Sequence, residues 1–225
     1  MAARVSRRKS EATRPAAGRR PAGKSGVREV RSAERREAIL AAALEEFAVN
    51  GFAGTRLDDI AQRAKIAKGT IYLYFADKET LFQELLRAMF APIVKGFEQM
   101  PADDVPTRDI IERIVALFVR EVIGTRRKDV IRLVISEGSR FPALAEFHYR
   151  EVLSRVIGAM SALMARAIAR GEVKNPAYAK FPQLIAAPGL VAVIWSGLFE
   201  RFAPLDVEAM MRAHLDIIFG ERKAP

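Results

Sequence analysis

Apolar residues recur at helical spacing from Ser32 almost to the C-terminus, and this pattern constrains the fold more than any other feature of the sequence. In the first such segment, Ile39, Ala43 and Phe47 fall on one helical face. No stretch alternates apolar and polar residues convincingly enough to predict a strand. The sequence therefore predicts an all-α fold of about nine helices. They span approximately 32–50, 57–64, 68–74, 77–97, 107–124, 130–138, 142–171, 182–202 and 206–219.

The ends of these helices are marked by residues with known terminal preferences. Asn50-Gly51 is predicted to end the first helix, Pro142 suits a first helical position, and Pro92 is expected to kink the helix that contains it. The boundaries predict a three-helix N-terminal domain over 32–80 and a larger helical bundle over 81–225. The predicted N-caps are Ser32, Asp77, Thr107 and Asp206.

The net charge of +10 is concentrated in the first 31 residues. This segment holds ten basic and two acidic residues, a net charge of +8, with few large apolar side chains. It cannot bury enough surface to offset the entropy of ordering, so we expect residues 1–31 to form a disordered arm. Three interpretations of the arm remain open: a tail that tracks DNA non-specifically, an organellar transit peptide, or an over-extended start without function.

Several classes of function are disfavoured by composition. Cysteine is absent, which removes disulfides, zinc fingers and thiol nucleophiles. The two histidines, His148 and His214, are far apart, and neither a metal-ligand spacing nor a phosphate-binding glycine loop is present, so we expect no enzyme activity, cofactor or metal. The N-terminal segment has no apolar stretch of the kind that a secretory signal needs, which predicts a cytoplasmic protein. The apolar run Leu184–Phe199 is short for a bilayer span and is interrupted by Pro188-Gly189, so we expect a buried helix and no membrane partner.

The segment Leu57–Tyr74 has the pattern of a helix-turn-helix. Two short helices that cross steeply need a small residue at the crossing, which Ala61 supplies, and apolar residues at fixed offsets. Those apolar positions are filled by Ile60, Ala64, Ile66, Ile71 and Tyr74. Lys65 stands where such turns favour glycine for its positive φ, and Ala67 is a poor N-cap, so the turn is expected to be strained or differently shaped.

A second helix that enters the major groove by its N-terminal end would present Lys68, Gly69 and Thr70 to DNA, with Gly69 allowing close backbone approach. The hydroxyls of Tyr72 and Tyr74 and the ammonium of Lys78 are predicted to contact phosphate. The alternative is a solvated surface with both tyrosines in the core. Across 32–80 eight acidic residues face seven basic ones, so the basic character of this domain is only local.

The segment 50–82 reads NGFAGTRLDDIAQRAKIAKGTIYLYFADKETLF and resembles the DNA-binding domain of the tetracycline-repressor (TetR) family. The segment 132–142, RLVISEGSRFP, resembles the C-terminal domain of AefR-like members. The resemblance implies a homodimer on a two-fold symmetric operator on double-stranded DNA, repression of nearby genes, and release by a small-molecule effector. It also implies that Thr55 and Arg56 meet phosphate or base, although Arg56 stands where a small hydroxyl residue is common.

Specific recognition generally needs two half-sites held by a dimer, and the last two helices are the natural interface. The alternative is that their apolar residues are monomer core, because obligate interfaces resemble a domain core cut in half. The predicted interface residues are Leu190, Val191, Val193, Ile194, Leu198, Met210, His214, Leu215 and Ile218.

A largely apolar ligand cavity is predicted between helices of the C-terminal domain. His148 is its best polar candidate, although for each residue a place in the ordinary core is the alternative. The predicted lining residues are Phe90, Phe97, Phe118, Phe147, His148, Met160 and Trp195. A ligand that shifts the helix from Asp77 would change the separation of the two recognition helices. Two other functions are possible alternatives. One is a helical enzyme or carrier, which no sequence motif supports, and the other is an architectural protein that coats DNA through its basic arm.

Overall fold

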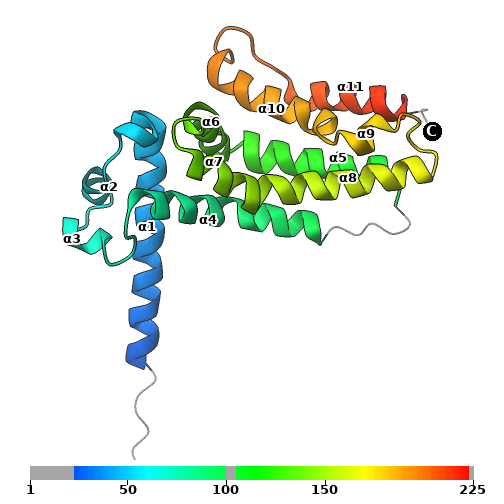
Figure 1. The fold of residues 1–225 in the computed structure, drawn as a ribbon. Coiled ribbons are helices and arrows are strands. Elements are labelled where there is room, and N and C mark those ends of the chain that lie inside the picture. The colour runs from blue at the N-terminus through cyan, green and yellow to red at the C-terminus, as the bar shows by residue number, and fades with distance from the viewer. Residues whose placement is uncertain (1–22, 100–104, 223–225) are drawn as a thin grey trace, which may run out of the picture. The chain divides into compact units, whose positions relative to one another are not determined.

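The computed structural model describes residues 23–99 and 105–222, and all regular structure within these ranges is helical (Figure 1). The chain divides into two units, residues 1–35 and residues 36–225. Ten continuous helices are present in the described ranges when segments joined by π-helical turns are counted once, against about nine expected. The all-α prediction is confirmed.

The first helix, α1 (Gly23–Gly54), begins at Gly23 rather than at Ser32. Ser32 is therefore not an N-cap, and residues 23–31, which were expected to be disordered, are helical. Residues 23–31 contain no proline, and Lys24, Arg28, Glu29 and Arg31 are good helix formers, so a helix nucleated further along can extend through them despite Gly26. Residues 1–22 of the expected arm lie outside the described residues. The predicted stop is confirmed, because Gly51 has a non-helical φ of 68°.

Two short helices follow, α2 (Leu57–Arg63) and α3 (Lys68–Ile71), which pack on each other as a helix-turn-helix. Ala61 and Ile71 are buried, as the pattern requires. Helix α3 is shorter than the predicted 68–74, because its backbone hydrogen bonds tighten after Ile71: the Leu73 N–H donates to the Thr70 carbonyl and the Tyr74 N–H to the Ile71 carbonyl.

The turn between α2 and α3 is a Schellman motif built on a lysine. The Ile66 N–H donates to the Ala61 carbonyl (3.0 Å) and the Lys65 N–H to the Gln62 carbonyl (3.1 Å). Lys65 has a φ of 55° and is the one non-glycine residue with positive φ in the described ranges. The strain expected from the sequence at this position is therefore confirmed. The end of α8 has the same hydrogen-bond pattern with Gly171 at the left-handed position.

Helix α4 (Lys78–Glu98) leads from the helix-turn-helix into the bundle, where it lies against α7 and α8 (Figure 1). Asp77 is its N-cap, as predicted, and accepts a hydrogen bond from the Thr80 N–H (2.7 Å). Pro92 lies inside this one continuous helix. The ring of Phe82 on α4 packs edge-on against Phe47 and Phe52, at centroid distances of 5.5 and 5.6 Å.

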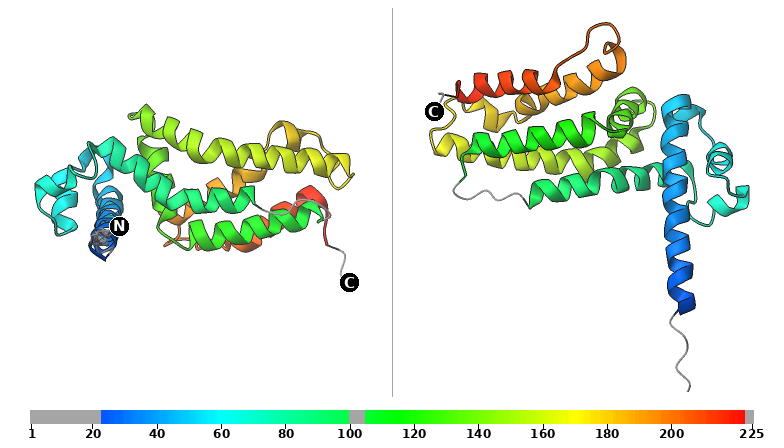
Figure 2. Two further views of the ribbon diagram at one scale, coloured as in Figure 1. Left: turned by 90° about the horizontal axis from the view of Figure 1, so that it is seen from below. Right: turned by 180° about the vertical axis from the view of Figure 1, so that it is seen from behind.

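The C-terminal bundle begins with α5 and ends with α11. Helices α10 and α11 lie side by side and form a layer of their own, with α11 on α5 and α10 on α6 (Figures 1 and 2). The elements are α5 (Thr107–Phe118) with the π-helical turn η1 (Val119–Ile123), α6 (Arg127–Glu137), α7 (Pro142–His148) with the π-helical turn η2 (Tyr149–Leu153) leading into α8 (Ser154–Ala169), α9 (Ala177–Lys180), α10 (Gln183–Leu198) and α11 (Val207–Phe219).

One of the two predicted caps in the bundle is wrong. Thr107 is the first residue inside α5, and the N-cap is Pro106, which has no side-chain hydrogen bond to offer. The carboxylate of Glu172 instead accepts from the Thr107 N–H (2.7 Å), so a residue distant in sequence satisfies this helix end. Asp206 caps α11 as predicted and accepts from the Ala209 N–H (2.9 Å).

Helix α10 differs from the buried helix that its composition suggested. Pro188 and Gly189 lie inside it rather than interrupting it, and its buried residues are Ile185, Ala192 and Val193. Most of its other large apolar side chains are exposed. Among the described residues, the stretch Pro142–Ala169 is long and apolar enough by length and composition to cross a membrane, and it packs here against α4, α5 and α9.

We expect Lys65→Gly to raise the free energy of unfolding by about 0.5–1 kcal/mol. Glycine adopts a positive φ without the steric cost that lysine bears, and this gain exceeds the larger conformational entropy that glycine loses on folding. Urea denaturation of the two proteins measures this difference. The control is Gln62→Gly at an exposed position inside α2, which should lower the free energy of unfolding by about 1 kcal/mol. A Lys65→Gly variant no more stable than the original chain would contradict the assigned strain.

Candidate functional site

The N-terminal end of α3 forms an exposed surface, as a recognition helix requires. Lys68 and Gly69 are exposed, Thr70 is half-buried, and Tyr72 is exposed just beyond the helix. Leu73 is 83% exposed and was missed by the sequence analysis, because it neighbours two tyrosines and reads as part of an apolar helical turn. These residues lie together because Ile71, between them, is fully buried and fixes the direction of the helix.

Gly69 is not required by the fold of the chain itself. A Cβ atom added to it would meet no atom within 4 Å, and its φ is not positive. The glycine therefore leaves open space outside the protein surface, where a partner's backbone can approach closely.

The local basic character predicted for this segment is largely offset by ion pairs. The Lys68 ammonium contacts the Asp58 carboxylate (2.6 Å), and the Arg63 guanidinium contacts Glu46 (2.5 Å). Glu46 is buried and also accepts a hydrogen bond from Asn50 (2.7 Å). Both acids come from outside the segment Ile60–Phe75, so a count along the sequence cannot detect the pairing.

Thr55 does not have the exposed hydroxyl expected of a DNA contact. Its side chain is buried, and its hydroxyl donates to the Gly51 carbonyl (2.7 Å), with the Glu46 carbonyl also within 3.2 Å of the same oxygen. The residue thus closes the end of α1. Arg56 is exposed, and its backbone N–H donates to the Asp59 carboxylate (3.3 Å) at the start of α2. Its guanidinium remains a candidate DNA contact.

Lys78 is also committed to the fold rather than to phosphate. Its ammonium donates to the carbonyls of Phe52 (2.6 Å) and Thr55 (2.9 Å) and lies over the Phe52 ring at 4.5 Å. Burial lowers the pKa of the Lys78 ammonium. Tyr74 is half-buried against the main hydrophobic core, which includes Ile71 and Phe75, and this agrees with the alternative that the sequence left open for this tyrosine.

Three of the predicted ligand-lining residues lie close together in the bundle. Phe90 and Phe147 are buried, and the His148 ring packs edge-on against Phe90 at 5.8 Å. Burial lowers the pKa of the His148 imidazole to about 4, so the ring is neutral at pH 7. Its Nδ1 atom is buried without a hydrogen-bond partner among the described residues. This is the one predicted polar group of the cavity that the structure leaves unsatisfied.

The other predicted lining residues are dispersed. Met160 belongs to a separate core cluster with α5 and α11, Phe97 packs against both this cluster and the main core, and Phe118 packs near Gly189 of α10. The Trp195 indole N–H donates to the Ala203 carbonyl (2.6 Å), and its ring lies 5.1 Å from that of Phe199. Trp195 therefore orders the connection between α10 and α11, apart from Phe90 and His148.

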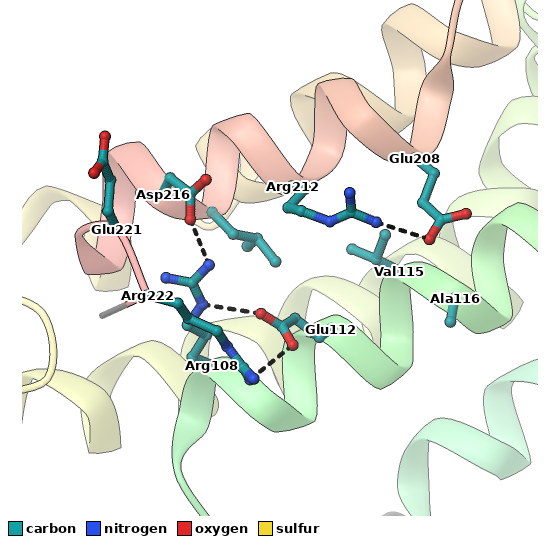
Figure 3. A pocket seen from close by; sticks show the side chains of 10 residues that line it. Arg108, Glu112, Val115, Ala116, Glu208, Arg212, Asp216, Glu221 and Arg222 are labelled. Atoms are coloured by element: carbon teal, nitrogen blue, oxygen red, sulfur yellow. Dashed lines mark hydrogen bonds and ion pairs between the residues drawn. The ribbon is translucent and has the colours of Figure 1, made fainter. Parts of the chain in front are cut away.

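A groove of about 500 Å³ lies between α5 and α11, and none of the predicted ligand residues lines it (Figure 3). Figure 3 shows the Arg108 guanidinium between Glu112 and Asp216, at 2.9 and 2.5 Å. Arg222 pairs with Glu112 (2.8 Å) and Arg212 with Glu208 (3.0 Å). The ion pairs of Arg108 and Arg222 join the end of α11 to α5. Because the groove is lined by these paired charges, it is a poor site for an apolar ligand.

The predicted interface residues divide into two groups. Val193, Leu215 and Ile218 are buried within the chain and are therefore monomer core, which corrects their assignment to the interface. His214 is half-buried, with its Nε2 atom 3.0 Å from the Leu184 carbonyl, and Ile194 and Met210 are half-buried as well. Large apolar side chains are exposed along α10 and just beyond it, and they are Leu184, Leu190, Val191, Leu198, Phe199 and Phe202.

Comparison with known proteins agrees with this geometry. Residues 39–85 match the family model "Bacterial regulatory proteins, tetR family", and residues 108–180 match "AefR-like transcriptional repressor, C-terminal domain". The transcriptional regulator RutR of Escherichia coli K12 is 28% identical over 88% of this chain and 89% of its own length. BetI of Paraburkholderia phytofirmans is 27% identical over 89% of this chain and 99% of its own. The chain spans 44% of YhgD of Bacillus subtilis, with 32% identity.

Solved structures share the fold. FadR from Bacillus subtilis, in complex with stearoyl-CoA, superposes with a TM-score of 0.66 at 20% identity, over 83% of this chain and 99% of that one. A TetR-family regulator from Mesorhizobium loti gives a TM-score of 0.64 at 21% identity, over 83% and 96%. RutR and BetI are HTH-type transcriptional regulators. With a helix-turn-helix in the structure and both family domains in order along the sequence, the chain belongs to the TetR family of DNA-binding, ligand-responsive transcriptional regulators and has an AefR-like C-terminal domain.

Proposed function

We propose that this protein is a repressor that binds a palindromic operator as a homodimer and leaves it when a small, largely apolar ligand enters residues 81–225. The observation that carries the proposal is the exposed end of α3, with a glycine at position 69 that the fold does not need. Arg56, Lys68, Thr70 and Tyr72 are the side chains proposed to contact DNA. The protein would act in the cytoplasm, without enzyme activity, cofactor or membrane partner.

The exposed apolar face of α10 supports the homodimer. Side chains such as Leu190 and Leu198, each at least half exposed, are costly to leave in water when they are this close together. A two-fold axis beside α10 would cover this face with the same face of a second copy and would place two recognition helices on one duplex. Leu190, Val191, Ile194, Leu198, Met210 and His214 remain the proposed interface residues.

The buried surroundings of His148 support an apolar ligand site. A neutral imidazole with an unsatisfied ring nitrogen beside Phe90 and Phe147 offers one polar anchor in an apolar environment, which is how small-molecule sites are usually built. Helix α4 carries Phe90 and begins at Lys78, whose ammonium binds the carbonyls that end α1. A ligand that displaces α4 would therefore also move the helix-turn-helix. The size of the effect depends on how much more tightly the ligand binds the protein with α4 displaced than with α4 in its present position.

Selection from a library of random duplex DNA with the full-length protein tests operator binding. We expect enrichment of a sequence with two inverted half-sites, because the two-fold axis of the protein is mirrored in the DNA. Gly69→Ala should weaken binding to that sequence by about 1–3 kcal/mol, the scale of one lost base contact. Gly158→Ala, at a second glycine with nothing within 4 Å, should leave it unchanged. Failure to enrich any sequence over random duplex at the same salt would favour the DNA-coating alternative.

Replacement of Leu190 and Leu198 together by glutamate should convert the dimer to a monomer, because each charge would be buried against a second copy. Sedimentation equilibrium measures the mass in solution. Ile135→Glu serves as the control, since Ile135 is a comparably exposed apolar residue on α6. A mass of one chain for the unmodified protein, or dissociation by Ile135→Glu, would contradict the proposed interface.

Saturated fatty acids of increasing chain length, free and as CoA thioesters, are suitable probes for the ligand site. We expect some of them to release the selected operator, with His148→Phe raising the concentration needed for half release by about tenfold, since one hydrogen bond to ligand is lost. Operator affinity without ligand should not change, which a gel-shift titration measures. If the original chain and His148→Phe leave the operator at the same ligand concentration, His148 is not the anchor.

A further inference from the structure

The ammonium of Lys68 is held beside α2 by one carboxylate. Lys68 is the first residue of α3, and its Nζ atom lies 2.6 Å from Oδ2 of Asp58, near the start of α2. The side chain of Lys68 is nevertheless 70% exposed, and that of Asp58 is 42% exposed. An ammonium has three N–H donors, so the ion pair leaves two of them directed toward solvent.

The two carboxylate oxygens of Asp58 lie in different surroundings. Its second carboxylate oxygen, Oδ1, is buried and has no hydrogen-bond partner among the described residues. With one oxygen enclosed by protein and the other bonded to Lys68, the carboxylate holds the ammonium beside α2. The hydrogen bond and charge of Asp58 also raise the pKa of the Lys68 ammonium, so the lysine is charged at neutral pH.

Two other cations of the domain are also held by the protein. Arg63 is paired with the buried Glu46, and Lys78 is bound to backbone carbonyls. The domain over 32–80 carries eight acidic and seven basic residues, so it lacks the positive charge of a general polyanion binder. A free lysine at the tip of α3 would bind phosphate on any duplex, whatever its sequence.

We propose that Asp58 is a specificity-determining residue that positions Lys68 for a base edge and keeps it from the phosphates of random DNA. On the operator, Lys68 keeps its bond to Asp58 and donates a second N–H to an acceptor in the major groove, such as O6 or N7 of guanine. On random duplex the ion pair persists and Lys68 makes no phosphate contact. This inference rests on the proposed operator binding and adds to it which carboxylate limits non-specific affinity.

The test compares Asp58→Asn with Asp59→Asn in the full-length chain. Both substitutions remove one negative charge from the first turn of α2, but Asp59 accepts from the Arg56 N–H and is not the partner of Lys68. Fluorescence anisotropy over a series of salt concentrations gives the affinity and its salt dependence for random duplex and for the selected operator. The double variant Asp58→Asn with Lys68→Met shows whether an effect passes through Lys68.

For Asp58→Asn we expect about fivefold tighter binding to random duplex, the upper range for release of one exposed ion pair, and a salt slope steeper by about 0.9, one additional phosphate contact. Operator affinity should stay the same or fall, so the ratio of the two affinities decreases. Asp59→Asn should shift both affinities equally, and the Asp58→Asn effect should disappear when Lys68→Met is present. A merely structural role of the ion pair would leave the salt slope unchanged.

Equal tightening on operator and random duplex, or an unchanged salt slope, would overturn the inference, because Asp58 would then repel DNA in general or serve only the fold. Those results would leave operator selection by the unmodified chain intact. If the unmodified chain itself shows no preference for any sequence, the proposed function fails first and this inference fails with it.

Discussion

Burial of Ile71 is the constraint on which the recognition surface depends. Helix α3 has four residues, far too few for a helix to be stable by its own hydrogen bonds, so tertiary packing holds it in place. Ile71 is fully enclosed together with Ile60 and Phe75, and it is the only buried residue of α3. The other residues of the helix are thereby directed outward. Any substitution that loosens this small core would move the exposed end of α3 as a whole.

Some of the charged and hydroxyl residues around this helix stabilise the fold and are not exposed for contact with DNA. Thr55 and Lys78 belong to the family motif, yet both are occupied in closing the end of α1. Matching a sequence to the motif residue by residue does not separate a structural role from a role in DNA binding. The positive charge that this surface can offer to DNA is therefore smaller than the sequence suggests. Each ion pair at the surface, such as that of Lys68 with Asp58, then has a larger effect on DNA binding.

In the C-terminal bundle, the distinction between core and surface depends on rotation about each helix axis. Leu215 and Leu198 are equally apolar in the sequence, but the first is buried and the second is exposed. A helix that is apolar on nearly every side, such as α10, has no periodic pattern from which its buried face can be read. For the same reason the sequence did not show where Trp195 points: it orders the connection between α10 and α11 and does not lie beside His148.

The sequence alone determined the helical class, the helix-turn-helix, the strained Lys65 turn and the Asp77 and Asp206 caps, because these depend on spacing and backbone preference within a few residues. Only the tertiary structure decided that Glu172 caps α5 and that Asp58 pairs with Lys68. Those contacts join residues that are distant in the chain, and the residue types alone do not select one partner among many.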